Sequence, residues 1–473
     1  MKAQTLSTKR AEVEWHNFAS FGQPERALAV YEEENRRRGG LLAKHLDFIG
    51  PLEAFLEIGA AAGHSSYMLA NQFGARGFAL DISADALRHG AHLMDAWGLR
   101  NAPVRVAGDA ANLPFQDGSL QFVMAFQMLS QFTGMEQVFR EVHRVLAPGG
   151  VFFLAEEPLR RLLTLGLYRC PYRESMKPWE RKLDEWGLLG YLVRDVIGAA
   201  QEEDFGIRQN HSMGLRRWHD LIHEYFAAAE YEIFVPERGW GERIVKKMAV
   251  RLDRHRSVWR AARLLGGTLA AFCRKAGAVS APSFGRLESL LRCPDCHAPF
   301  EIVESYTLAC ACGYRAPLED GVYNLLPSRE KTELYPGDRE DTVDFSRPGH
   351  EDSLLSGWSE IEGVFGNKYR WIARRAAARL KRTREGPQRL RIRGHAHELF
   401  FQQGDAPRIE VKVNGAGAGV WKPDRPGVFV LEADVAEAAE YVVEISAAPV
   451  WTCPPDDREF TVTISMLRLI PRE

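Results

Sequence analysis

Short apolar runs and amphipathic stretches alternate along the first third of the chain. Apolar runs end at Glu57-Ile58, Asp81 and Ala125, and a further run covers 151–154. Runs of this length with few polar residues are typical of parallel strands that are buried on both faces. An amphipathic helix is predicted over 139–146, ended by Ala-Pro-Gly-Gly. The pattern therefore predicts an α/β domain built on a parallel sheet.

A loop of small residues, Gly59–Gly63, separates the first strand from a helix that begins near His64. Such a loop lets the backbone approach a ligand closely, although a tight structural turn has the same composition. Asp81 ends the second strand, where a dinucleotide-type fold offers a carboxylate to a ribose diol. The alternative role for Asp81 is a helix cap.

The strings LEIGAAAGHSS, ALDIS, GDAANLPFQDGSLQFV and FREVHRVLAPGGVFFLAEEP follow in this order over about residues 52–158. They resemble the class I methyltransferases that use S-adenosylmethionine, in particular their small-molecule branch. The resemblance implies a Rossmann-like fold, with Asp81 at the ribose, Asp109 at the adenine amine and Gln127 on the methionine side. The cofactor-binding residues that it implies are Glu57, Gly59, Ala61, Gly63, Asp81, Ile82, Asp109, Ala110 and Gln127. Two departures stand out: Ala61 replaces the middle glycine of the loop, and Gln121 replaces the usual aspartate of the fourth strand.

We expect residues 1–50 to form N-terminal helices and residues 51–285 to form the methyltransferase domain. In the first part, a helix over 25–38 ends at Gly39-Gly40 and a shorter one covers 41–48. A helical insertion at about 159–230 is expected to bind the acceptor, because ligands of open α/β sheets lie at the strand ends. Within it, His211 is the candidate general base. The alternative is that His211 lies on the surface beside a helix cap.

The stretch 241–275 is strongly basic, with apolar residues interleaved. This pattern indicates an amphipathic helix that contacts an anionic membrane surface or a phosphate-bearing substrate. A solvated helix face has the same pattern.

Four of the seven cysteines are clustered, as Cys293-Pro-Asp-Cys296 and Cys310-Ala-Cys312. Four thiolates at this spacing are typical of a closed, structural zinc site, whereas a disulfide or redox pairs are the alternative. The segment 286–328 resembles the small zinc-ribbon proteins that partner RNA and protein methyltransferases, and this implies Zn²⁺ bound by Cys293, Cys296, Cys310 and Cys312.

Residues 329–352 are expected to be a linker, and residues 353–473 an all-β sandwich. Short alternating strands are predicted at 389–392, 399–401, 408–413, 428–431, 441–445 and 459–469. This part resembles β-sandwich modules appended to bacterial enzymes of surface-polysaccharide assembly, which implies a sugar-containing acceptor. Four tryptophans are candidates for stacking on sugar rings or for packing, namely Trp358, Trp371, Trp421 and Trp451.

The composition narrows the function classes. The net charge is −2, with 26% charged residues, so no overall electrostatic footprint for nucleic acid is present. No apolar run reaches the length of a membrane span and no secretory leader is evident, so we expect a cytoplasmic protein.

The expected activity is methylation of a small or glycan-linked acceptor, at oxygen. The alternatives are an RNA methyltransferase and a non-catalytic adaptor of surface-polysaccharide assembly, whose methylase fold binds S-adenosylmethionine or nothing.

Overall fold

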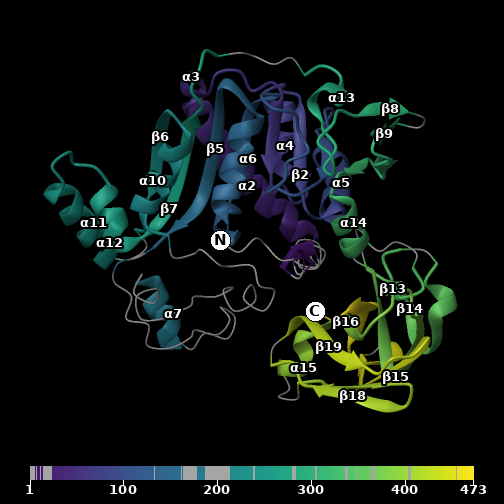
Figure 1. Cartoon of the computed structure of the whole chain (residues 1–473). Coiled ribbons are helices and arrows are strands. Elements are labelled where there is room, and N and C mark those ends of the chain that lie inside the picture. The colour runs from purple at the N-terminus through teal and green to yellow at the C-terminus, as the bar shows by residue number, and fades with distance from the viewer. Residues whose placement is uncertain are drawn as a thin grey trace. The chain divides into compact units, whose positions relative to one another are not determined.

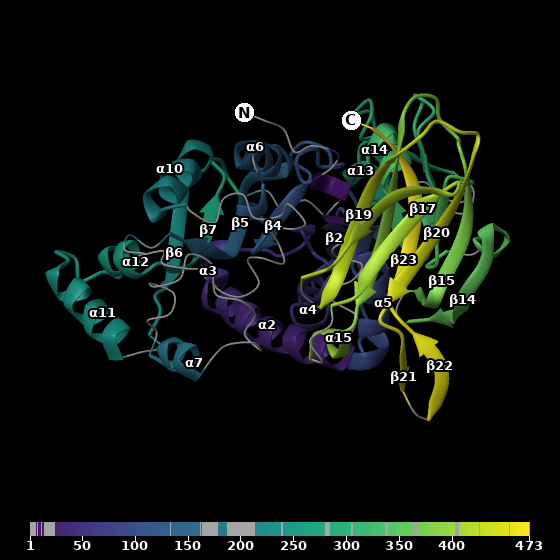
Figure 2. The same ribbon diagram turned by 90° about the horizontal axis from the view of Figure 1, so that it is seen from below.

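The computed structural model describes residues 6, 8–10, 12–13, 24–132, 134–160, 162, 178–186, 213–237, 240–279, 284–303, 306–335, 339–347, 349–363, 368–402, 406–424, 426–453 and 455–472. The chain divides into two compact units. The first consists of Met1–His16 and Glu25–Leu334, and the second of Asn17–Pro24 and Tyr335–Glu473. Figures 1 and 2 show the elements of both units.

A nine-stranded sheet forms the centre of the first unit, in the order β11-β12-β3-β2-β1-β4-β5-β7-β6. The strands from β12 to β5 are parallel, whereas β7, β6 and β11 run antiparallel to their neighbours. The α/β prediction is therefore confirmed. The strands are β1 (Phe55–Ile58), β2 (Gly77–Asp81), β3 (Val104–Ala107), β4 (Leu120–Phe126), β5 (Leu146–Leu159), β6 (Ala228–Phe234), β7 (Gly267–Arg274), β11 (Leu318–Glu319) and β12 (Val322–Asn324).

Helices cover both faces of this sheet (Figures 1 and 2). Successive residues of a strand point to opposite faces, so Phe55 joins one hydrophobic core while Leu56 and Ile58 join the other. The first core includes residues of α4 (His64–Gln72), and the second includes residues of α6 (Met135–Val145) and α10 (Leu215–Tyr225). The order β3-β2-β1-β4-β5 with helices on both faces is the Rossmann-like arrangement. The helix α5 (Ala84–Trp97) follows β2.

The helix predicted over 25–38 is longer than expected. The helix α2 (Pro24–Lys44) continues through Gly39 and Gly40, where we expected it to end, and α3 (Leu46–Ile49) follows. Packing explains the difference, because a Cβ at Gly39 would lie 3.4 Å from the Met68 sulfur of α4. A small residue at this position lets α2 approach α4 closely.

The basic stretch 241–275 is not one helix. It contains α11 (Trp240–Leu252), α12 (Trp259–Leu265) and then β7. Gly266 and Gly267 have positive φ values of 72° and 127°, which end α12 and turn the chain into the sheet. None of the described helices has both the length and the apolar character needed to span a bilayer.

The cysteine-rich segment belongs to the first unit. It contains α13 (Leu287–Leu290) and a three-stranded sheet of β8 (Glu301–Val303), β9 (Thr307–Ala309) and β10 (Arg315–Ala316). The strand β12 then pairs in parallel with β3 and so extends the large sheet. The expected linker 329–352 instead contains part of α14 (Ser328–Leu334) and β13 (Thr342–Asp344). Leu334 is buried in the first unit and Val343 in the second, so the described parts of this segment belong to the two units.

The second unit is all-β, as predicted, but its main strands form one nearly closed sheet instead of two packed ones. The order is β18-β17-β20-β15-β23-β16-β19, and the two end strands β18 and β19 contact each other. The long strand β15 makes the sheet continuous, because its residues 370–371 pair with β23 and its residues 375–381 pair with β20. The strands are β14 (Leu354–Glu362), β15 (Tyr369–Lys381), β16 (Gln388–Ala396), β17 (Arg408–Val413), β18 (Ala416–Trp421), β19 (Gly427–Val435), β20 (Glu440–Ala448) and β23 (Thr463–Pro471).

Two further strand predictions in this unit differ from the structure. The predicted strand 399–401 lies in the helix α15 (Glu398–Gln402), in which Phe400 is buried against the Trp451 ring, with centroids 5.3 Å apart. The predicted strand 459–469 is divided between β22 (Asp456–Phe460) and β23. The strand β22 forms a separate two-stranded hairpin with β21 (Trp451–Cys453).

Candidate functional site

The loop between β1 and α4 holds its backbone in the left-handed region at three alternate positions. The φ values are 68° at Gly59, 48° at Ala61 and 79° at Gly63. Gly59 also gives Met128 room, because a Cβ there would lie 3.0 Å from the Met128 side chain and would require it to shift. Ala61 adopts the same region at a cost of about 1 kcal/mol. This loop lies at the carboxyl ends of the parallel strands, where open α/β sheets bind their ligands.

Asp81 connects this loop to the next helix. Its Oδ2 accepts a hydrogen bond of 2.8 Å from the Ala61 N–H, and its Oδ1 accepts one of 2.8 Å from the Ser83 N–H. The residue is 2% exposed. The structure therefore brings Asp81 and Ala61 together, whereas Ser83 is the residue that caps α5, through the Ala86 N–H. Ile82 follows and is half-buried.

Glu57 holds the start of α4. Its Oε2 accepts hydrogen bonds from the Ser66 N–H at 2.8 Å and from the Ser66 hydroxyl at 2.6 Å. Burial raises the pKa of Glu57 to about 7. A carboxyl group with this pKa is partly protonated near neutral pH. The charge of the Glu57 side chain, which contacts the start of α4 next to the loop, therefore changes in that pH range.

Asp109 lies in the segment after β3, and Lys9 from the N-terminal part of the chain contacts it. Lys9 Nζ lies 2.8 Å from Asp109 Oδ2 and also donates to Glu330 of α14. The Ala111 N–H donates to Asp109 Oδ1 at 2.8 Å, and Ala110 between them is buried. Burial lowers the pKa of Lys9, but the charges and hydrogen bonds of Asp109 and Glu330 outweigh it, so the net shift is upward.

The helix α2 places a buried charged cluster against the same loop. Arg38 Nη1 donates to the Ser65 hydroxyl at 2.9 Å, and Arg38 Nη2 forms an ion pair of 2.6 Å with Glu156. The guanidinium also lies 4.1 Å from the centroid of the Phe126 ring. Arg38 thus joins the start of α4 to the ends of β4 and β5.

His64 is the second member of this cluster. Its Nε2 lies 2.8 Å from Glu34 and 2.6 Å from Arg38 Nη1, and its ring stacks on Tyr31 at a centroid distance of 4.1 Å. Burial is the main cause that lowers the pKa of His64. No spacing in the sequence predicts this cluster, because its members come from α2, α4 and β5.

The ends of β4 and β5 complete the site. Gln127, expected on the methionine side, is exposed with a φ of 51°, and its N–H donates to the Ala155 carbonyl at 3.0 Å. Glu157 is fully buried and accepts hydrogen bonds from the Leu129 and Ser130 N–H groups at 2.9 and 3.1 Å. Burial raises its pKa to about 7. Glu157 lies shortly after the apolar run 151–154 in the sequence, but the sequence pattern assigns no role to it.

Two further residues singled out in the sequence are the departure at Gln121 and the candidate base His211. Gln121 lies near the start of β4, the opposite end from the loop, and its buried side-chain amide has no hydrogen-bond partner among the described residues. The departure at this position therefore does not touch the candidate site. His211, the candidate base, lies outside the described residues.

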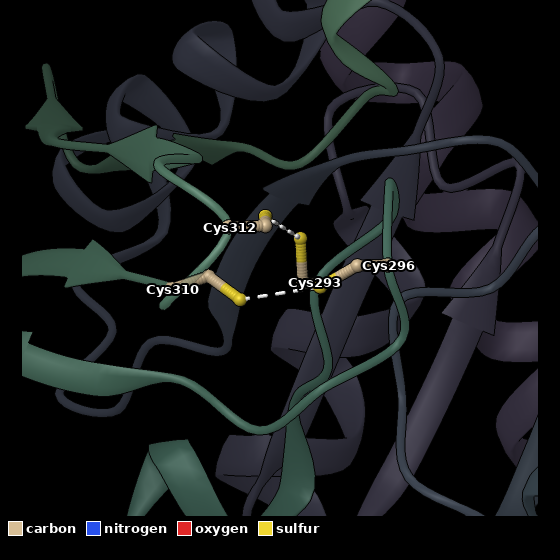
Figure 3. A group of neighbouring side chains, drawn as sticks. All are labelled: Cys293, Cys296, Cys310 and Cys312. Atoms are coloured by element: carbon tan, nitrogen blue, oxygen red, sulfur yellow. Dashed lines mark hydrogen bonds between the residues drawn. The ribbon is translucent and has the colours of Figure 1, made fainter.

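The four clustered cysteines converge (Figure 3). All four Sγ atoms lie within 4.8 Å of one another, and the pairs Cys293–Cys312 and Cys296–Cys310 are 3.7 and 3.4 Å apart. Four sulfurs bound tetrahedrally at ~2.3 Å are ~3.8 Å apart, so the donor set fits Zn²⁺. A disulfide requires ~2.05 Å between sulfurs, so none of the four is disulfide-bonded here.

The second unit contains a pocket of about 310 Å³. Four aromatic rings, two carboxylates, an arginine and a histidine line it. Arg458 forms ion pairs of 2.8 Å with Glu362 and 2.7 Å with Asp456, and the Trp371 and Phe460 rings meet edge to face at 5.1 Å. The lining residues are Glu362, Trp371, His397, Leu399, Phe400, Trp451, Asp456, Arg458, Phe460 and Thr461.

The four candidate tryptophans thus separate into two groups. Trp371 and Trp451 line the pocket. Trp358 donates from its indole N–H to the Ala377 carbonyl at 2.7 Å and packs against the core, as does Trp421. The pattern of tryptophans alone could not separate these roles.

Residues 55–150 match the family model described as "Methyltransferase domain". Norajmaline N-methyltransferase of Rauvolfia serpentina is 29% identical over 128 residues, which are 27% of this chain and 41% of that protein. The human mitochondrial 2-methoxy-6-polyprenyl-1,4-benzoquinol methylase is 30% identical over 135 residues, 28% of this chain and 41% of that protein. The chain thus spans less than half the length of these curated relatives. Among solved structures, Haemonchus contortus phosphoethanolamine N-methyltransferase 2 in complex with S-adenosyl-L-methionine is 17% identical with a TM-score of 0.31, covering 57% of each chain.

Proposed function

We propose that this chain, whose residues 55–150 form a methyltransferase domain, transfers a methyl group from S-adenosylmethionine to a small or glycan-linked acceptor, at oxygen. The observation that supports this best is the buried Asp81 carboxylate, which accepts a hydrogen bond from the Ala61 N–H at the carboxyl ends of the strands. A carboxylate beside a loop in the left-handed region is a recognition element for a ribose diol.

The described residues fit this cofactor. Asp81 and Asp109 are acceptors at the ends of neighbouring strands, suited to ribose hydroxyls and to the adenine amine. The loop with Gly59, Ala61 and Gly63 would lie along the methionine part, with Glu57 and Gln127 beside it. Ile82 follows the ribose carboxylate Asp81, and Ala110 would lie beside Asp109 at the adenine. When bound, S-adenosylmethionine supplies a methyl group that its positively charged sulfur activates.

The residues of the chain then have to orient the two reactants and exclude water. The cluster of Arg38, His64 and Glu156 supports the loop from the side of α2 and fixes the start of α4. Because these groups bind one another, the loop is held before the cofactor arrives. A base is needed only for a hydroxyl acceptor, and His211 is our candidate to take that proton.

The acceptor class rests on two observations. The methylases named above are called after small organic molecules. The pocket of the second unit combines aromatic rings with the carboxylates of Glu362 and Asp456. Besides their contacts with Arg458, these carboxylates can accept further hydrogen bonds. Aromatic faces pack on the C–H groups of a sugar ring, and carboxylates accept its hydroxyls, so the pocket supports recruitment of a glycan-linked acceptor.

The metal has a structural role in this proposal. Cys293, Cys296, Cys310 and Cys312 would fill a tetrahedral Zn²⁺ site and leave no position for water or substrate. The segment also contacts the Asp109 side of the site, because Asn112 donates to the Pro294 carbonyl at 3.1 Å. The cysteines therefore stabilise the segment that supports Asp109.

Calorimetric titration with S-adenosylmethionine tests the cofactor proposal. We expect micromolar binding that Asp81→Ala weakens at least about 100-fold, since two charge-assisted hydrogen bonds are lost. Asp85→Ala is the matched control, because Asp85 is an acidic residue of α5 that pairs with Arg88. No binding to a folded, zinc-loaded sample would overturn the enzyme and favour an adaptor. Cofactor binding without methyl transfer to any glycan or small hydroxyl compound would contradict the acceptor class alone.

A further inference from the structure

The helix α11 carries a row of exposed apolar side chains on one face. Trp240, Met248 and Leu252 are 65%, 56% and 67% exposed, and Ile244 and Val245 lie between them at 49% and 38%. Positions 240, 244, 248 and 252 are four residues apart, so they follow one side of the helix. On the opposite side, Glu242 and Ala249 are 4% and 3% exposed. The helix is therefore anchored by one face while its other, apolar face is open.

Basic side chains flank this apolar row. Arg243, Lys247 and Arg251 are exposed on α11, and Arg254 follows in the next turn. Within the described part of the chain, Lys247, Arg251 and Arg254 have no ion-pair partner, whereas Lys246 pairs with Glu237. The positive charge is local, because the whole chain has a net charge of −2.

We propose that this face of α11 binds to the surface of an anionic lipid bilayer, with the helix in the plane of the interface. A helix with a tryptophan-containing apolar face and adjacent free cations is the arrangement that such surfaces recognise. Charge complementarity decides the occupant, because Lys247, Arg251 and Arg254 meet phosphate head groups while the apolar row enters the acyl boundary. A nucleic acid would leave the apolar row in water.

The apolar face of α11 does not include any residue of the candidate active site. The helix α11 packs on α12, and its Ala249 belongs to the core of the first unit. None of its residues is among the candidate cofactor-binding residues. Substitutions on its exposed face therefore change surface binding without changing cofactor binding.

Co-sedimentation with vesicles tests the proposal on the full chain. One set contains phosphatidylglycerol in phosphatidylcholine, and the other contains phosphatidylcholine alone. We expect binding to the first set that decreases with added salt. Trp240→Ser/Met248→Ser/Leu252→Ser should weaken it about 100-fold, because three apolar side chains are lost. Lys247→Gln/Arg251→Gln should weaken it about 25-fold, at about five-fold for each cation.

Leu355→Ser/Val420→Ser is the matched control, since both residues are exposed apolar positions of the second unit, at 42% and 52%. This variant should bind as the wild type does, and circular dichroism and cofactor titration should show every variant folded. Absence of binding by the wild type, or unchanged binding by the triple variant, would overturn the proposal. Equal binding to both vesicle sets would refute the electrostatic recognition. A wild-type dimer that becomes monomeric in the triple variant, without vesicle binding, would instead assign the face to a second copy of the chain.

Discussion

Lys9 Nζ lies 2.8 Å from Asp109 Oδ2, although the two residues are one hundred positions apart in the chain. Lys9 is 5% exposed and also donates to Glu330 of α14. One ammonium group therefore connects the N-terminal part, the segment after β3 and the helix that follows the cysteine-rich segment. The candidate adenine-side carboxylate thus depends on residues from three distant parts of the sequence.

Replacing Lys9 should destabilise the first unit. Lys9→Met leaves Asp109 and Glu330 without their cation, and breaking a buried pair in this way costs about 3 kcal/mol. A double-mutant cycle with Asp109→Asn, measured by urea unfolding, should give a coupling energy above about 1 kcal/mol. Additive effects of the two substitutions would contradict the importance of this contact.

Ala61→Gly should relieve strain in the loop. A φ of 48° costs alanine about 1 kcal/mol, which glycine does not pay. Glycine, however, raises the conformational entropy of the unfolded chain, and this offsets part of the gain in stability. We expect a net gain of about 0.5 kcal/mol and unchanged or tighter cofactor binding. The control is Ala62→Gly at the neighbouring buried position, which should destabilise the protein. If both substitutions destabilise it equally, the loop is not strained at Ala61.

Glu57 should make the stability of the first unit depend on pH. Its folded-state pKa of about 7 lies above the ordinary value of 4.5, because the site is buried. The folded state therefore holds the proton more tightly, so this group favours folding below about pH 4.5, and that contribution is lost as the pH rises through 7. The loss is on the order of 3 kcal/mol.

Glu57→Gln keeps an acceptor for Ser66 and removes the titration. Stability to thermal unfolding should therefore fall less steeply between about pH 4.5 and about pH 8 in this variant than in the wild type. The matched acidic control is Glu53→Gln, at a partly exposed residue that pairs with Arg76. Parallel pH profiles for all three proteins would show that Glu57 does not carry the effect.

Removal of the metal should lower both stability and cofactor affinity. We expect one zinc per chain, and a strong chelator or Cys310→Ser should lower the melting temperature by several degrees. Cofactor binding should weaken as well, because the cysteine segment holds the residues around Asp109 through Asn112 and Pro294. Cys273→Ser is the control, since this buried cysteine of β7 lies outside the cluster and its loss should leave the zinc content unchanged. A zinc-free wild type with full stability would refute the site.

Local patterns in the sequence were sufficient for the strands β1, β2 and β4, because each is a short apolar run followed by a turn signal. For β5 they predicted only the run 151–154, whereas Ala147–Gly150, expected to form the turn before it, lies within the strand. They were also sufficient for the cysteine cluster, whose spacing is set by the chemistry of four thiolates. They failed at β15, where the sequence RWIARRAAARL is rich in helix-favouring alanine and arginine. Pairing with β14, β20 and β23 outweighs that propensity.

For the candidate site as well, contacts between residues near strand ends could be predicted, whereas contacts between distant parts of the chain could not. Asp81 and the loop Gly59–Gly63 are close in sequence to strand ends, so their meeting could be predicted. The contacts of Lys9 with Asp109 and of Arg38 with Glu156 join residues 100 and 118 positions apart. No local period encodes such contacts, because they depend on how α2 and the N-terminal part pack on the finished sheet.

The parallel pairing of β12 with β3 limits where the chain can be shortened. The strand β12 shields the edge of β3, and the neighbouring residue Leu325 donates its N–H to the Ala107 carbonyl at 2.7 Å. A fragment that stops at residue 285 would contain the strands from β1 to β7 yet expose that edge to water and to other chains. We expect such a fragment to aggregate, whereas one that extends through Leu334 should stay dispersed. The domain built on the large sheet therefore ends, in physical terms, after the cysteines and not before them.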